Sequence, residues 1–476
     1  MRVTLPLLGG HHKDEASEIN NQQLINWEVH AERPGGVGRI SLKPTPGLTL
    51  ETTQGNGPCR SHLVEFQDKG YWVSGSQLFS IDSTWAVTLI GSLNTASSWC
   101  VLAAGRDYLM VVDGTDGYTW DGTDFLVIGD TDADFPAGPT WVIQTGGVFY
   151  ANDATTDRVF ASDFSTGSEN PAAWGALDFI TAEEDPDDVV AIVRTFDNVY
   201  LGGSRTTQIY YKSGNSDFPL SLSSNGVLEF GTDAPASVDT ANGEIFLLGR
   251  TTAGGIDVIR VSGFQAQSIA EPDMLDEFEG YETIADAEGF AYSQGQHTYY
   301  ELTFPTESMT WVYTTKTGEW HKRESYGLTR HRVRGHGFFN GRHLVGDYEN
   351  GNLYYLDPTN YTENGSTIVR TRVTALVNRD GKQLECNELE VHFKRGVGLV
   401  SGQGSDPQAM LRYSIDGGET WSNTIRRSIG QIGDTTRRAV WDRLGQGASF
   451  IFEISVSDPV EAVIIAIYAD IVELQS

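Results

Sequence analysis

A strand, a glycine-containing turn and a second strand recur along most of the chain. GYWVSGSQLFSID (70–82) predicts a hairpin that turns at Ser74–Gly75, and Asp-Gly pairs divide RDYLMVVDGTDGYTWDGTDFLVIGD (106–130) into three short apolar runs. Asp-Gly between alternating apolar residues is a strong hairpin signal, because primed turns need positive φ. Units of the same kind follow at residues 146–163, 198–214, 243–263, 290–305, 309–324 and 336–357.

The recurrence predicts an all-β fold whose main body is a β-propeller. Successive units lie roughly 45–50 residues apart, the period of propeller blades, and radial repetition protects the edges of short sheets. From about Cys59 to Asp357 this period gives about six blades, a count that could be off by one. We assign residues 56–365 to the propeller. Helical periodicity is scarce, and the two helix candidates are Asp273–Glu279 and Asp14–Trp27.

Two segments lie outside the repeat. Residues 1–55 contain the turn clusters ERPGGVGR (32–39) and PTPG (44–47), and we expect an irregular N-terminal arm that docks elsewhere on the protein. After a polar joint at 360–366 the strands lengthen and alternate with period two, which is typical of strands with one buried face. Residues 366–476 are therefore predicted to form a separate antiparallel, sandwich-like β-domain.

The charge balance restricts the partners of the chain. There are 33 Lys and Arg against 64 Asp and Glu, a formal net charge of −31. Such an excess repels phosphate backbones and excludes ordinary nucleic-acid binding by counterion release. It serves solubility, or it provides an acidic wall that DNA passes without sticking. No run of about 18 apolar residues predicts a membrane span.

No cofactor or metal site is predicted. Cys59, Cys100 and Cys386 are an odd, widely spaced set, which indicates core residues rather than a disulfide framework or a metal cluster. HHKDE (11–15) lacks a second ligand pair, and AEEDPDD (182–188) lacks the alternating ligands and Gly turn of a calcium loop. DGTDGYTWDGTD (113–124) is closer to such a loop, but turns alone explain it, so a cation there stays open.

Three further patterns bear on chemistry. YSIDGGETW contains Ser414, Asp416, Gly418, Thr420 and Trp421 in the Asp-box pattern of sialidases and other propellers, which is a structural hairpin turn. HRVRGHGF (331–338) is basic and is expected to be an exposed face. The signatures GxSxG, HExxH, CxxC and the phosphate loop do not occur, so no catalytic residue is assigned and an enzyme is not expected.

The alternative is a carbohydrate-binding propeller, either a sialidase-like hydrolase or a lectin. Binding a sugar carboxylate requires converging arginines. The candidates lie in successive predicted blades and are Arg194, Arg205, Arg250 and Arg260.

An ordered series of segments resembles one known family. The segments are DNVYLGGSRTTQIYYKSG (197–214), QHTYYELTFPTESMTWVYTTKTGEWHKRESYG (296–327), HGFFNGRHLVGDYENGNLYYLD (336–357) and RAVWDRLGQGASFIFEISVSDPVEAVIIAIYADI (438–471). Together they resemble the phage packaged-DNA stabilisation family, the tail hub or nozzle of short-tailed phages.

The resemblance implies a structural virion protein that forms a hexameric ring below the portal and adaptor. The ring would close and line the DNA exit channel and would bind the tail needle, fibres or spikes, and no catalytic site carries over from the family. The implied location is the virion tail, after assembly in the host cytoplasm, without membrane insertion. Genomic DNA would pass without specific binding, and we expect the surface that faces the channel to be net acidic.

Overall fold

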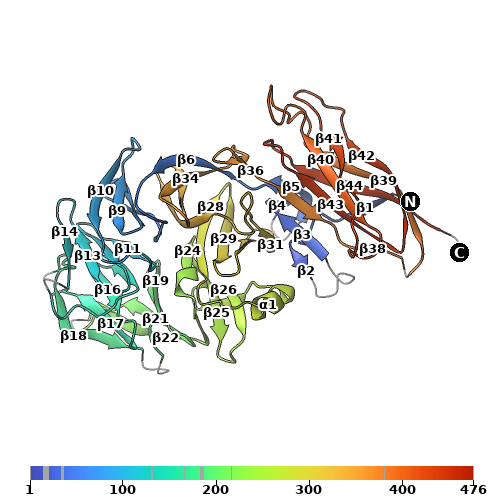
Figure 1. Cartoon of the computed structure of the whole chain (residues 1–476). Helices are drawn as coiled ribbons and strands as arrows, with labels where there is room; N and C mark the ends of the chain where they lie inside the picture. Colours follow the sequence, from blue (N-terminus) through green and yellow to red (C-terminus); the bar gives the residue numbers. More distant parts are fainter. Residues whose placement is uncertain are drawn as a thin grey trace.

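The computed structural model describes residues 2–13, 21–33, 37–129, 132–165, 167–182, 187–215, 217–379 and 381–474. Seven small antiparallel sheets surround one axis, and a two-sheet sandwich lies beside them (Figure 1). The described part contains one α-helix, α1 (Pro272–Glu279), which confirms the predicted helix there. The other helix prediction was wrong, because Asn21–Ile25 and Trp27–Arg33 are strands, while residues 14–20 lie outside the described residues. No described helix is long and apolar enough to cross a bilayer.

The first four blades are four-stranded antiparallel sheets. Their strand ends coincide with the glycine turns of the sequence; Gly75, Gly114 and Gly122 have φ of +56°, +83° and +98°, which an L side chain adopts only with strain. The strands of blades one and two are β7 (Val64–Phe66), β8 (Lys69–Ser74), β9 (Gln77–Ile81), β10 (Val87–Ser92), β11 (Val101–Ala104), β12 (Leu109–Val112), β13 (Gly117–Trp120) and β14 (Phe125–Val127). Those of blades three and four are β15 (Val142–Thr145), β16 (Val148–Asn152), β17 (Arg158–Ser162), β18 (Trp174–Thr181), β19 (Ala191–Thr195), β20 (Asn198–Gly202), β21 (Thr207–Lys212) and β22 (Leu220–Leu228).

The last three blades follow the same plan, with additions at their edges. The strands of blade five are β23 (Phe230–Gly231), β24 (Asp239–Ala241), β25 (Glu244–Thr251), β26 (Ile256–Ser262) and β27 (Gln265–Ser268), with a 3₁₀ turn at Pro235–Ser237. Those of blades six and seven are β28 (Glu288–Gln294), β29 (His297–Phe304), β30 (Met309–Thr314), β31 (Glu319–Lys322), β32 (Val333–Phe339), β33 (Arg342–Asp347) and β34 (Asn352–Asp357), followed by the small pair β35 (Thr362–Glu363) and β36 (Ser366–Thr367).

The propeller closes with a strand from the other end of the sequence. β6 (Gly47–Thr53) pairs antiparallel with β34 and is the fourth strand of blade seven. The inner strands β7, β11, β15, β19, β24, β28 and β32 contact one another in a closed ring. The blades therefore number seven, one more than the expected six. Six blades follow from a period of roughly 45–50 residues over 59–357. The blades are more closely spaced in places, because the first strands of blades one and two start only 37 residues apart.

Each pair of neighbouring blades encloses its own hydrophobic core. Phe66, Val73 and Leu109, for example, pack between blades one and two, and seven such clusters complete the circle. A blade strand is therefore covered on both faces, and every residue of β29 is buried. The three cysteines are free and buried, as predicted for core residues.

The sandwich is built from both ends of the chain. Its strands pack around a single core that includes Trp27, Trp441 and Phe452. One sheet contains β1 (Arg2–Leu5), β4 (Trp27–Arg33), β5 (Val37–Pro44), β39 (Leu384–Phe393), β42 (Ala439–Gly447) and β44 (Ile464–Glu473). The other contains β2 (His12–Lys13), β3 (Asn21–Ile25), β37 (Arg370–Val373), β38 (Val377–Asn378), β40 (Gln408–Ser414), β41 (Ile425–Ser428) and β43 (Ser449–Val456).

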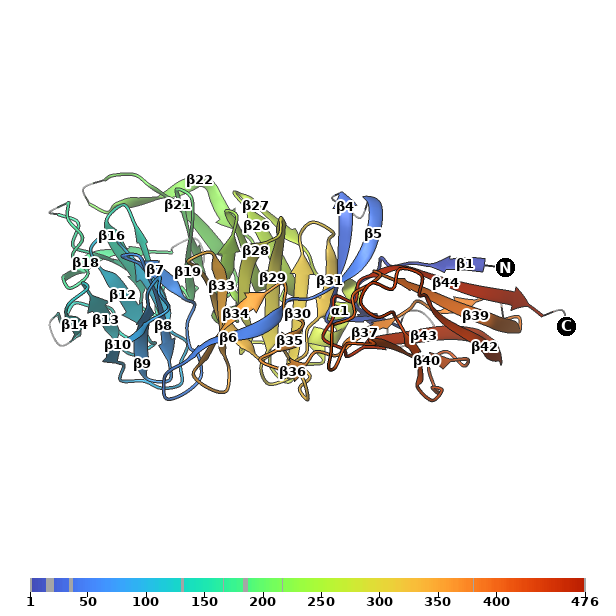
Figure 2. The same cartoon turned by 90° about the horizontal axis from the view of Figure 1, so that it is seen from above.

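The N-terminal segment was wrongly expected to be irregular. β1 pairs with β44 and β6 continues into blade seven, as the blue strands in Figure 2 show. β3 pairs with β37. β3 also pairs in parallel with β31, which joins blade six to one sheet of the sandwich. Of the turn cluster 32–39, residues 32–33 end β4, residues 37–39 begin β5, and residues 34–36 lie outside the described residues; the cluster 44–47 connects β5 to β6. The sandwich is consequently not separate from the N-terminal segment, because residues 2–44 supply part of it.

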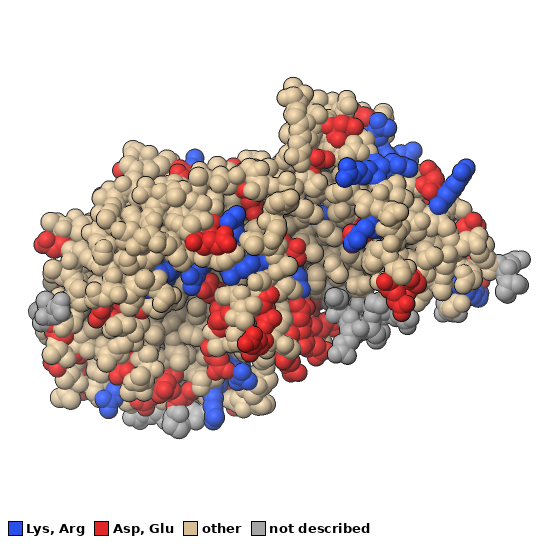
Figure 3. Space-filling view, viewed as in Figure 1, with Lys and Arg blue, Asp and Glu red and all other residues tan. Residues whose placement is uncertain are grey.

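Charge is distributed unevenly between the two bodies. Residues 47–365 carry 16 Lys and Arg against 45 Asp and Glu, whereas residues 1–46 and 366–476 together carry 17 against 19. On the face in view, most acidic side chains lie over the propeller and several basic ones over the sandwich (Figure 3). The acidity of the chain therefore belongs to the propeller part.

Candidate functional site

The axis of the propeller is a cavity of about 410 Å³ that residues of all seven inner strands line. Its ionisable side chains are few, and each has a structural contact. Arg194 donates to the Gln144 carbonyl at 3.0 Å, the Asp239 carboxylate accepts the Ala291 amide at 2.8 Å, and the ring of His62 packs edge-on against Trp99. Burial raises the pKa of Asp239, against the opposing effect of His62. Among these lining residues, no nucleophile lies beside a base.

The arginines considered for a sugar carboxylate do not converge. Arg194 lines the axial cavity. Arg250 pairs with Asp233 at 2.6 Å and Arg260 pairs with Glu244 at 2.5 Å, both within blade five. Arg205 lies in the turn between β20 and β21, where its amide donates to Asp187 at 2.6 Å. The geometry gives the sialidase alternative no support.

The acidic turns are held by their own backbone. Asp113 accepts the amides of Thr115 and Asp116 and the Tyr118 hydroxyl, and Asp121 accepts two amides within its own turn. Across the described ranges, no three His, Cys, Asp or Glu side chains are placed to hold a metal ion.

Two other acidic or histidine-containing runs fall partly outside the described residues. Residues 183–186 of AEEDPDD and residues 14–15 of HHKDE are not described. Asp187, which is described, fixes the β20–β21 turn through Ser204 and two amides. His11 is buried, with its ring edge-on to Trp311 at 5.1 Å.

The Asp-box residues form a turn in the sandwich, between β40 and β41. Asp416 accepts the Thr420 amide at 2.9 Å and the Ser414 hydroxyl at 2.6 Å, and the Ser414 hydroxyl accepts the Gly418 amide. Hydrogen bonds from Ser414 and Thr420 lower the pKa of Asp416 to about 2. The motif organises a hairpin, as the sequence predicted.

The basic run 331–338 was wrongly expected to be an exposed face. His331 is fully buried, Arg332 pairs with Asp347 at 3.0 Å, and Arg334 pairs with Glu288. This run leads into β32, the inner strand of blade seven, and its arginines are neutralised by carboxylates of blades six and seven instead of by water. His331 leads into the most deeply buried polar network of the described chain.

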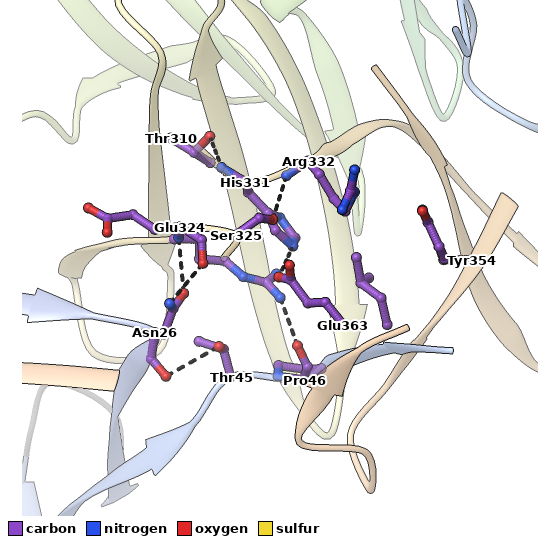
Figure 4. A network of polar contacts seen from close by, with 12 residues as sticks. Asn26, Thr45, Pro46, Thr310, Glu324, Ser325, His331, Arg332, Tyr354 and Glu363 are labelled. Atoms are coloured by element: carbon purple, nitrogen blue, oxygen red, sulfur yellow. Dashed lines mark hydrogen bonds and ion pairs between the residues drawn. The ribbon is translucent and has the colours of Figure 1, made fainter. Parts of the chain in front are cut away.

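That network lies where blades six and seven meet the N-terminal segment (Figure 4). The Glu301 carboxylate contacts the Arg323 guanidinium at 3.1 Å and His331 Nδ1 at 2.6 Å, and all three side chains are at most 2% exposed. His331 Nε2 lies 3.5 Å from Glu363, which stands on β35. Burial opposes ionisation of Glu301, but His331 and Arg323 hold its pKa below the ordinary value.

The same network anchors the chain that connects the two bodies. The Arg323 guanidinium donates to the Pro46 carbonyl at 2.9 Å, just before β6. Asn26 bridges further, because its side chain bonds both main-chain groups of Glu324 and its carbonyl accepts the Thr45 hydroxyl. Charged residues from blade six thus fasten the segment that completes both the sandwich and the propeller. Sequence reasoning missed this network.

Glu28 extends the buried polar region from β4 toward the propeller. It is 9% exposed and accepts the Tyr299 hydroxyl at 3.2 Å. Burial raises the pKa of Glu28 from 4.5 to about 7, although Tyr299, Arg323 and Lys43 favour its charged form. When the pKa of a carboxyl group is higher in the folded state than in the unfolded state, the folded protein becomes less stable as the pH rises from the lower pKa to the higher one.

We therefore expect Glu28→Gln to stabilise the protein only at higher pH. At pH 8 the variant should gain on the order of 3 kcal/mol in the free energy of unfolding, because it avoids a buried charge and keeps an acceptor for Tyr299. At pH 4.5 the gain should nearly vanish. The measurement is the Tm of both proteins from pH 4.5 to 8, with Glu453→Gln at the half-exposed pair with Arg412 as the control. An equal difference at every pH would contradict the role of Glu28.

Comparison with known proteins agrees with this architecture. Residues 3–361 match the family model described as bacteriophage P22 Gp10, beta-propeller, and residues 369–472 match that described as bacteriophage P22 Gp10, beta-sandwich. No curated protein sequence matches the chain.

Solved structures with similar folds are distant in sequence. Virginiamycin B lyase from Staphylococcus aureus is 10% identical with a TM-score of 0.42, over 63% of this chain and 94% of the lyase. The N-terminal domain of Nup159 is 10% identical with a TM-score of 0.39, over 69% of this chain and 97% of that one. PorZ of Porphyromonas gingivalis is 12% identical with a TM-score of 0.39, over 79% of this chain and 46% of PorZ. Likenesses at this level carry no argument about function.

Both family models together span nearly the whole chain, and the family expected from the resemblance is confirmed. The chain belongs to the bacteriophage P22 Gp10 family of packaged-DNA stabilisation proteins and is a structural component of a phage virion.

Proposed function

We propose that the protein is one subunit of the tail hub, or nozzle, a hexameric ring below the portal and adaptor. The ring closes the DNA exit channel after packaging and lines it during ejection. Its other partners are the tail needle, fibres or spikes. One observation supports this proposal beyond family membership. The N-terminal segment forms strands in the sandwich and in the propeller, and its strand pairing links these two parts of the chain.

The charge asymmetry supports a channel through which DNA slides without adhering. The 45 acidic and 16 basic residues of residues 47–365 give the propeller a formal charge of −29. Acidic groups that face a phosphate backbone provide no counterion release, and their repulsion acts within a Debye length of about 8 Å at physiological salt. We propose that propeller surfaces face the channel.

The decisive experiment is assembly on a portal–adaptor complex from the same phage. Purified chain, alone and mixed with the complex, is analysed by native mass spectrometry and electron microscopy. We expect a monomer in isolation and six added chains, in a ring with a net acidic lumen, on the template. A chain that stays monomeric beside an intact template would refute the tail-hub proposal, and a basic lumen would refute the account of DNA passage.

A further inference from the structure

A second cavity, of about 240 Å³, lies at the junction of the two bodies. One wall is the β4–β5 hairpin, another is the start of β29 in blade six, and the third comes from the segments around Tyr361 and Glu461. The side chains that matter for its chemistry are Glu28, His30, Lys43, His297, Tyr361 and Glu461. The proposed function of the protein makes no use of this cavity.

His297 is the polar group that this cavity leaves unsatisfied. Its side chain is 4% exposed, and within the described chain neither ring nitrogen has a hydrogen-bond partner. The rings of His30 and Tyr299 lie against it, with centroids 4.9 Å and 5.9 Å away. Because these contacts are made through the faces of the rings, they provide no hydrogen-bond partner for Nδ1 or Nε2 of His297. A buried polar group in this condition is costly unless a ligand or water satisfies it.

The electrostatic surroundings of His297 are positive. Burial, then Lys316, His30 and Lys43, lower its pKa to about 4, and burial with the same two lysines lowers the pKa of His30. Among the described residues, neither Lys43 nor Lys316 has a carboxylate within ion-pair distance. Two cations without a described ion pair therefore act on two adjacent imidazoles, and Lys43 also acts electrostatically on Glu28.

The acidic groups at the cavity do not cancel this field. Glu461 on the sandwich forms an ion pair with Lys394. Glu28 on β4 has a pKa of about 7, so at neutral pH it is only partly ionised. Tyr299 on β29 donates its hydroxyl to Glu28, and Tyr361 is uncharged at this pH. The cavity thus combines Lys43, which has no described ion pair, with the unused imidazole of His297.

We propose that this cavity binds a small oxyanion, such as inorganic phosphate or a carboxylate, with a ring N–H of His297 as donor and Lys43 as counter-charge. The volume suits an ion of this size, and the bound anion contacts three parts of the chain at once. Binding therefore stabilises the junction between propeller and sandwich. It tightens as the pH falls from 8 to 6, because protonation of Glu28 removes a competing negative charge.

The test is calorimetric titration of the full chain with inorganic phosphate and, separately, with acetate, at constant ionic strength in chloride. We expect a one-to-one complex with at least one anion. The pH comparison uses acetate, whose charge is the same at pH 6 and pH 8, and its binding should be tighter at pH 6. Lys43→Met and His297→Phe should each weaken it by roughly tenfold or more, because each removes a charged or buried partner. Lys69→Met, at an exposed lysine of blade one, is the control and should bind like wild type. Glu28→Gln should bind at pH 8 as wild type does at pH 6.

A second measurement covers the case in which the His297 variant does not fold. In wild-type protein with labelled imidazole nitrogens, phosphate or acetate should shift the His297 resonances more than those of His392, which pairs with Glu390 outside the cavity. Absence of heat with both anions, equal affinity in Lys43→Met, or an unchanged His297 resonance would each overturn the proposal. Ring assembly on the portal–adaptor template is a separate measurement, so the outcome of the anion-binding experiments does not decide the tail-hub proposal.

Discussion

Glu301→Leu is expected to lower the free energy of unfolding by about 3–5 kcal/mol, because it leaves the Arg323 guanidinium buried without its carboxylate. Both side chains are at most 2% exposed, so water cannot replace the lost partner. The measurement is urea-induced unfolding followed by tryptophan fluorescence and by calorimetry. Glu453→Leu, whose partner Arg412 is 43% exposed, is the matched control and should cost about 1 kcal/mol or less.

The double variant Glu301→Leu with Arg323→Met separates charge from packing. Removing both partners of a buried pair is much less destabilising than removing one, so the double variant should recover part of the loss. The pH dependence gives an independent check. Glu301 and Glu363 have folded pKa values below 4.5 despite burial, so their contribution is present above that pH and is lost on acidification through the folded pKa. A loss equal to that of the control, or one that does not diminish on acidification, would disprove the importance of this pair.

Deletion of residues 2–10 is expected to destabilise the sandwich by about 4 kcal/mol, through the buried Arg372. The Arg372 guanidinium donates to the carbonyls of Pro6, Leu8, Gly9 and Gly10, and burial lowers its pKa to about 10. The deletion leaves this cation in the core with Gln22 as its remaining side-chain partner.

A double-variant cycle tests that explanation. In full-length protein Arg372→Leu should cost about 2–3 kcal/mol, since it leaves several carbonyls unpaired. In the truncated protein the same substitution should cost much less or should stabilise, because it removes the unpaired cation. Thermal unfolding of the four proteins measures the coupling. Effects that simply add would show that the N-terminal strand stabilises the sandwich by pairing with β44 alone.

The blade repeat could be predicted because its causes are local. Tight turns need glycine or Asp-Gly at fixed places, and strands covered on both faces must be apolar throughout. Residues 198–214 and 336–357 therefore predict hairpins without any information from distant parts of the chain. The number of blades could not be obtained in this way. The fourth strand of blade seven is β6, about 300 residues away from its partner β34, and only tertiary pairing shows which sheet residues 47–53 complete.

The junction network could not be predicted for a similar reason. Glu301 is on β29 and Glu363 is on β35, whereas Arg323 and His331 lie in the segment between β31 and β32, and no spacing rule relates the four residues. One signal existed: Glu301 interrupts the strand HTYYELTF, where a charge inside a fully buried run demands a buried partner. The basic residues in 331–338 could then have been interpreted as buried partners of such a carboxylate, as His331 is for Glu301, instead of as a solvent-exposed face.

The position of β6 determines the order in which a nascent chain can finish folding. Residues 47–53 leave the ribosome first and must wait until β34 has been synthesised before they can pair. Until then the incomplete propeller has two open flanks, at β7 and β6, and β44 has not yet been made to receive β1. Completion of the propeller thus waits for residues 352–357, and completion of the sandwich waits for residues 464–473. A truncated product lacking the last strands retains unpaired edges, which favours its aggregation over incorporation into a particle.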